Sequence, residues 1–123
     1  MLEQADLVAF VATTDLDRSR AFYCDTLGLS VVEESPFALV LDAHGTTVRV
    51  TPVEAVVAAP YTVLGWQVPD TGVAARALAA AGVACERFGG MEQDDLGVWT
   101  APGGDRIAWF RDPDGHLLSV SGG

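Results

Sequence analysis

The sequence contains no apolar run that approaches the roughly 18 residues of a membrane-spanning helix. Its first residues, Met1 to Asp6, include acids at positions where a secretory signal peptide carries Lys or Arg. We therefore expect a soluble, cytoplasmic protein with no membrane partner.

Cysteines and basic residues are also scarce. The two cysteines, Cys24 and Cys85, form no CxxC motif, which excludes a disulfide framework and a zinc knuckle. Seven basic residues stand against 17 acidic ones, for a formal net charge of −10. Because proteins bind a phosphate backbone through Lys and Arg, this balance excludes nucleic acid as a partner. We interpret the acids as a solvating surface.

Apolar residues, in contrast, make up half of the 123 residues. A chain of this length buries about two-thirds of its unfolded surface and needs no covalent staples. The composition predicts a single folded domain over residues 1–123.

Short apolar runs and turn residues define the first half of the chain. Residues 7–12 are predicted to form a strand that is covered on both faces. Asp15 is placed to cap a helix over residues 16–27, whose inner face would carry Ala21, Phe22, Tyr23 and Leu27. Gly28 is placed to end that helix. Strands are predicted at 29–34, 37–41 and 46–51.

The second half repeats this order after a joint bracketed by Pro52 and Pro60. A strand is predicted at 61–68, and a helix at 73–81 with an inner face of Val73, Ala77, Leu78 and Ala81. Further strands are predicted at 83–88 and 98–101, and a hairpin over 107–120 turns at Asp112-Pro113-Asp114-Gly115.

The repeat predicts an α+β fold of two tandem βαβββ modules, residues 7–51 and 61–121. Each module covers one face of its sheet with a helix and leaves the other, concave face uncovered, so that face must pack against a second layer. We expect the paired modules to form a curved mixed sheet around a cavity.

Two motifs resemble those of the glyoxalase, bleomycin-resistance and extradiol-dioxygenase superfamily, also called the vicinal oxygen chelate family. The first is Asp15-Leu16-Asp17-Arg18-Ser19 with Ala21-Phe22-Tyr23 and Leu27-Gly28-Leu29, and the second runs from Trp109 to His116. The resemblance covers almost the whole chain. It implies the paired βαβββ fold, assembled as a homodimer.

Enzymes of this family hold a divalent metal ion through His, Gln or Glu. Counted from Asp15, Asp42, Asp70 and Asp112, the corresponding positions here are Val8, Arg49, Val63 and Ser119. None of these side chains is a usual ligand of such an ion. We therefore expect no metal and no cofactor.

If the positions that hold the metal ion in the family face the cavity here too, strand alternation predicts which other side chains do so. The expected ligand-binding residues are Phe10, Phe37, Leu39, Arg49, Gln67, Trp99, Ile107, Trp109 and Ser119. Such an apolar, aromatic lining with few polar groups suits a small, flat, partly hydrophobic ligand.

Several residues allow two interpretations. Trp99 would close over the cavity or pack under it, and Arg49 would contact a ligand or form a structural ion pair. His44 and His116 are interpreted as solvated turn residues, and Cys24 as a small core residue.

The leading hypothesis is a metal-independent protein that binds a small aromatic molecule, as the bleomycin-resistance type does when it confers antibiotic resistance by sequestering a drug. The alternative is a glyoxalase-like enzyme, a lyase or dioxygenase, that acts on a small carbonyl or aromatic metabolite. A regulatory or accessory module is a third possibility.

Overall fold

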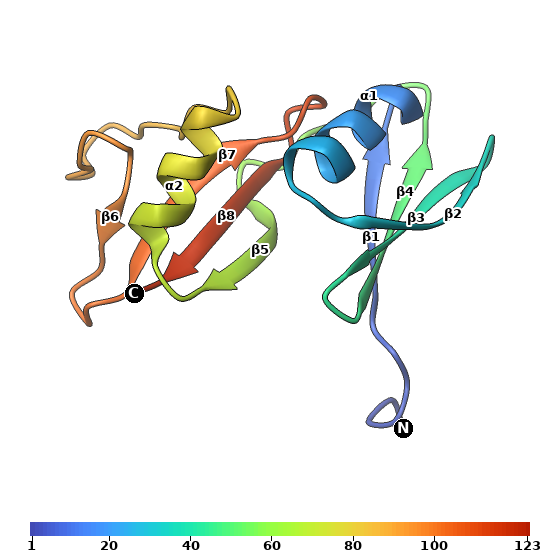
Figure 1. Ribbon diagram of the computed structural model, residues 1–123, viewed down its shortest axis with the longest axis horizontal. Helices are drawn as coiled ribbons and strands as arrows, with labels where there is room; N and C mark the ends of the chain where they lie inside the picture. Colours follow the sequence, from blue (N-terminus) through green and yellow to red (C-terminus); the bar gives the residue numbers. More distant parts are fainter. The chain divides into compact units, whose positions relative to one another are not determined.

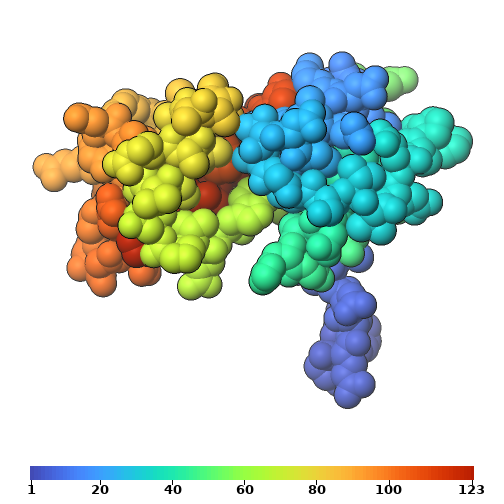
Figure 2. Space-filling view, viewed as in Figure 1, coloured from blue at the N-terminus to red at the C-terminus, as the bar shows by residue number.

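The computed structural model describes residues 1–123, which divide into two compact units, residues 1–57 and 58–123. Each unit is built on a four-stranded mixed sheet (Figure 1). In the first unit, the exposed residues before β1 project away from the sheet (Figure 2). No helix is long and apolar enough to cross a membrane.

The first unit has the order predicted from the sequence. Its elements are β1 (Val8–Thr13), α1 (Leu16–Arg20), η1 (Ala21–Thr26), β2 (Ser30–Ser35), β3 (Ala38–Ala43) and β4 (Thr46–Pro52). The strand order is β1-β4-β3-β2, with β1 parallel to β4 and the other pairs antiparallel. The sheet is therefore a βαβββ unit.

Side chains at the end of β1 and just after it form the hydrogen bonds that fix the beginning of α1. Asp15 accepts a hydrogen bond from the backbone N–H of Arg18 (3.1 Å), and Ser19 Oγ donates to the buried Thr13 Oγ1 (2.7 Å). The predicted helix is confirmed, although its second half, η1, is a π-helix. Phe22 and Tyr23 are buried as expected, whereas Ala21 is exposed.

Only one face of the first sheet is buried. α1 packs against β3 and β4, where Leu41, Val48 and Val50 are at most 3% exposed. The prediction that the first strand is covered on both faces is wrong, because Val8 and Phe10 are 41% and 67% exposed. They point to the face opposite the helix.

The second unit is built in the same way. Its elements are β5 (Thr62–Val68), α2 (Thr71–Ala80), β6 (Trp99–Thr100), β7 (Arg106–Arg111) and β8 (Leu117–Gly122). The strand order is β5-β8-β7-β6, and only the β5–β8 pair is parallel. The α+β fold of two mixed sheets, each with a helix on one face, is confirmed.

The buried face of α2 differs from the predicted one. Asp70 caps the helix by accepting from the N–H of Val73 (3.1 Å), so the helix begins two residues earlier than expected. Thr71, Ala75 and Leu78 are buried at helical spacing, and the Thr71 hydroxyl donates to the carbonyl of Arg106 (2.9 Å). Of the four residues predicted to face inward, only Leu78 does: Val73, Ala77 and Ala81 are exposed.

The predicted hairpin of β7 and β8 is confirmed. Its turn is held by Asp112, whose carboxylate accepts from the N–H groups of Asp114 (3.0 Å) and His116 (2.9 Å). Gly115 supplies the positive φ of 88° that the turn requires. The interpretation of His116 as solvated is wrong, because it is 8% exposed, whereas His44 is exposed as expected.

Candidate ligand-binding face

Five of the predicted site residues lie on one face of the second sheet. The register pairs Trp99 with Ile107, Trp109 with Ser119, and Gln67 with Ser121, which in turn pairs with Ile107. The other face, which contacts α2, carries the buried Ala108, Phe110, Leu118 and Val120. Alternation therefore brings Gln67, Trp99, Ile107, Trp109 and Ser119 to the side opposite the helix.

Three aromatic rings meet on this face, and we refer to Phe88, Trp99 and Trp109 as the aromatic cluster. The Phe88 ring meets Trp109 edge to face, with centroids 5.5 Å apart and planes at 89°. The Trp99 ring also contacts Trp109, with ring centroids 6.2 Å apart and planes at 36°. All three side chains are half-buried, so part of each ring is free for further contact.

Phe88 was not among the predicted site residues, because residues 83–88 were expected to form a strand. No strand forms there; a single backbone hydrogen bond, from Glu86 N–H to the Trp109 carbonyl (2.7 Å), ties the segment to β7. Trp99, for which two positions were open, is a β6 residue packed beside Trp109. An irregular segment carries no period from which Phe88 could have been placed.

The side chain of Gln93 holds this irregular segment in place. Its Oε1 accepts from the Phe88 N–H (2.8 Å), and its Nε2 donates to the carbonyls of Glu86 (2.8 Å) and Gly97 (2.7 Å). Gln93 thereby joins both ends of the loop and fixes the backbone that carries Phe88. No sequence pattern marks a loop glutamine for this role.

Replacing Gln93 with alanine should lower the free energy of unfolding by about 2 kcal/mol, because three hydrogen bonds are lost and two carbonyls lose their donor. Urea denaturation followed by tryptophan fluorescence measures the change. Glu92→Ala is the matched control, since Glu92 is an exposed neighbour in the same loop. Equal stability of the two variants would contradict the proposed role of Gln93.

A polar pocket of about 680 Å³ adjoins the aromatic cluster through Trp99. Its other lining residues are Gly90, Glu92, Gln93, Asp94, Val98 and Thr100. The Asp94 carboxylate is engaged, since Oδ1 accepts from the N–H groups of Leu96 and Val98 (both 2.9 Å) and Oδ2 lies 3.6 Å from Arg106. The pocket thus offers polar contacts beside an aromatic surface.

The predicted site residues of the first unit do not share one face. Phe10 pairs with Arg49, which pairs with Val40, so these three lie opposite the helix. Leu39 pairs with Val50 on the helix side and is 1% exposed, so its predicted orientation is wrong. Phe37 precedes β3, in the turn after β2, and is 80% exposed.

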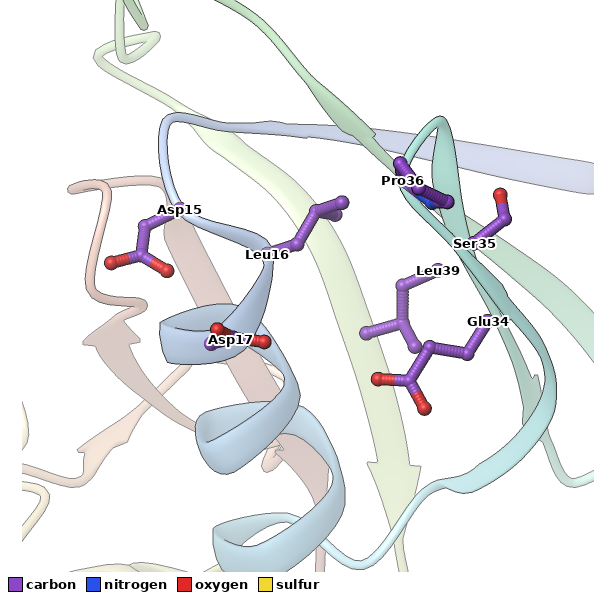
Figure 3. Close-up of a pocket in the computed structure, with 7 residues that line it drawn as sticks. All are labelled: Asp15, Leu16, Asp17, Glu34, Ser35, Pro36 and Leu39. Atoms are coloured by element: carbon purple, nitrogen blue, oxygen red, sulfur yellow. The ribbon is translucent and has the colours of Figure 1, made fainter.

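Leu39 instead lines a pocket of about 490 Å³ on the helix side of the first sheet (Figure 3). The other lining residues are Asp15, Leu16, Asp17, Glu34, Ser35 and Pro36. Glu34 lies on β2, and its carboxylate pairs with Arg20 at 3.2 Å. This pocket is acidic and carries no aromatic ring.

The four positions where the family holds its metal ion do not offer a ligand set. Val8 and Arg49 lie on the same face of the first sheet, and Val63 lies at the irregular point of the β5–β8 pair that also contains Ser119. Within neither unit do three or more His, Cys, Asp or Glu side chains gather in a way that could hold a metal ion. These residues do not fit the family's metal ion.

The two cysteines are not activated nucleophiles. Burial raises the pKa of the Cys24 thiol and that of the Cys85 thiol, and the negative charge of Asp94 raises the pKa of Cys85 further. Nucleophilic attack requires the thiolate, which a raised pKa disfavours at neutral pH. Neither side chain suggests covalent chemistry.

Comparison with known proteins agrees with this architecture. The lactoylglutathione lyase from Agrobacterium tumefaciens has a TM-score of 0.76 at 19% identity, over 98% of this chain and 94% of that chain. UcmS2 has a TM-score of 0.75 at 17% identity, over 98% and 99%. A glyoxalase-related enzyme from Fulvimarina pelagi has a TM-score of 0.72 at 22% identity, over 98% and 88%. These likenesses show a shared fold.

The sequence itself carries the family assignment. No curated protein matches the chain. The family model described as Glyoxalase/Bleomycin resistance protein/Dioxygenase superfamily matches residues 5–120, which is nearly the whole chain. The chain therefore belongs to the glyoxalase, bleomycin resistance protein and dioxygenase superfamily.

Proposed function

We propose that this protein binds a small aromatic or hydrophobic molecule without a metal ion and confers antibiotic resistance by sequestering it. The observation that carries this proposal is the aromatic cluster on the face of the second sheet opposite α2. Superfamily membership supports it, since the family includes bleomycin resistance proteins.

The chemistry of this face favours a flat ligand with few polar groups. The half-exposed rings of Trp99 and Trp109 offer a surface for offset stacking. Gln67, Ser119 and Ser121 lie on the same face and supply hydrogen-bond donors and acceptors that can orient a ligand. Binding by stacking and a few hydrogen bonds needs no reactive group.

The direct test is a tryptophan-fluorescence titration with a panel of planar aromatic antibiotics. Trp109→Ala should weaken binding by ~1 to 3 kcal/mol, because Trp109 is the ring that touches both others. Trp66→Phe is the control, since Trp66 stacks on Phe110 on the helix side and should not touch the ligand.

The outcomes separate the two functions considered from the sequence. Unchanged affinity in Trp109→Ala would remove the aromatic cluster from the binding site. Recovery of the antibiotic unaltered by mass spectrometry would support sequestration, whereas conversion of the bound compound would favour an enzyme. The sequestration proposal predicts stoichiometric binding without turnover.

A further inference from the structure

Arg49, in the first unit, is a basic residue without a hydrogen-bond or ion-pair partner in the protein. All seven basic residues are arginines, and five of them contact oxygen atoms of the protein: Arg18, Arg20, Arg87, Arg106 and Arg111. Neither Arg49 nor Arg76 forms a hydrogen bond or an ion pair. Arg76 is exposed on α2, where water solvates its charge, but Arg49 is half-buried on a sheet.

The neighbours of Arg49 on the open face of the first sheet are mostly uncharged. Phe10 on β1 and Val40 on β3 lie on either side of it in the register. Two acids share the face, and neither pairs with it. Asp42 lies opposite Thr47 and accepts from the N–H of Gly45 (3.2 Å), and Glu33 lies on β2 beyond Val40. The two residues paired with Arg49 in the register are thus apolar.

This arrangement leaves hydrogen-bonding capacity unused. Because Arg49 is half-buried and has no acceptor in the protein, its guanidinium depends on water or on a ligand for its hydrogen bonds. Two residues further along β4, on the same face, the Thr51 hydroxyl oxygen is buried without a hydrogen-bond partner. Beside Arg49, the Phe10 ring is 67% exposed and unusually accessible for its size. A cation and an apolar ring are therefore both available on adjacent strands.

We propose that the open face of the first sheet binds the carboxylate of a small aromatic acid through Arg49. The planar guanidinium donates two parallel hydrogen bonds to the carboxylate, a geometry that arginine satisfies and lysine does not. Phe10 packs against the ring of the same ligand. All residues of this site belong to the first unit, whereas the aromatic cluster belongs to the second.

Benzoate tests the proposal, with benzamide as a neutral ligand of the same shape. In an NMR titration of the full chain, benzoate should shift the Nε–H signal of Arg49 to saturation, and benzamide should not. Equal binding of the two compounds, or benzoate binding that leaves the Arg49 signal in place, would overturn the proposal. The indole signals of the tryptophans report separately on the aromatic cluster.

Variants of Arg49 provide the second arm. Arg49→Gln should weaken benzoate binding by roughly tenfold or more, and Arg49→Lys should retain part of it, since the charge remains but the bidentate geometry is lost. Arg76→Gln removes an arginine from the second unit and should bind benzoate as the wild type does. Wild-type affinity in both Arg49 variants would show that another group binds the carboxylate.

Discussion

Replacing Phe110 with alanine should destabilise the second unit by about 3 to 5 kcal/mol. Phe110 is 1% exposed on the face of β7 that contacts α2, pairs with the fully buried Leu118, and stacks on Trp66 with centroids 6.3 Å apart. Truncation removes a ring from the centre of this core and leaves a cavity that the sheet cannot close. Chemical denaturation followed by circular dichroism measures the loss.

The neighbouring Trp109→Ala variant is the matched control for this prediction. Trp109 is adjacent in sequence, but its side chain lies on the opposite face and is only half-buried. It should therefore lose ligand affinity while keeping most of its stability, whereas Phe110→Ala should unfold at much lower denaturant concentration. Equal loss of stability in the two variants would contradict the assignment of core and open faces.

Replacing Gly122 with alanine should destabilise the same unit by about 3 kcal/mol. The added methyl group would meet backbone atoms, which cannot move aside as a flexible side chain can. Gly122 ends β8 opposite Val68, and a Cβ added there would overlap the Val68 carbonyl oxygen. The end of the β5–β8 pair must separate to make room. The adjacent hydrogen bond from Thr71 N–H to the Gly123 carbonyl (2.8 Å) would be disturbed as well.

Thermal denaturation of Gly122→Ala beside Gly89→Ala tests this reasoning. A Cβ at Gly89 would meet no atom within 4 Å, so that variant should melt close to the wild type. A melting temperature of Gly122→Ala that matches Gly89→Ala would show that the strand ends adapt without cost.

Local signals allowed most of the fold to be predicted. Asp15 and Asp70 each cap a helix, Asp112 and Gly115 shape the hairpin turn, and the repeated order of elements follows from these signals. Such features depend on hydrogen bonds between residues close in sequence, so they can be recognised without knowledge of the fold.

The errors arose where a segment's position depends on contacts distant in sequence. Leu39 was assigned to the wrong face because its orientation follows from the pairing of Val40 with Arg49 across β3 and β4, and a shift of one residue inverts every side chain. Val73 was placed inside because it is apolar, whereas packing of α2 on β7 and β8 buries the polar Thr71 together with Ala75 and Leu78.

The candidate site shows the same division. In the second unit, alternation counted from the family's metal positions grouped Gln67, Ile107, Trp109 and Ser119 on one face, and the register adds Trp99, whose position was open. It could not add Phe88, because that ring is held by the long-range contact of Glu86 with Trp109 and by the side chain of Gln93.

The family, the tandem βαβββ order and the caps and turns follow from the amino-acid sequence, because each depends on residue types at short, fixed spacings. The strand register, the buried face of α2, the packing of Phe88 on Trp109 and the unpaired state of Arg49 emerge in the folded chain. These features depend on which distant segments meet, and no local pattern records that choice.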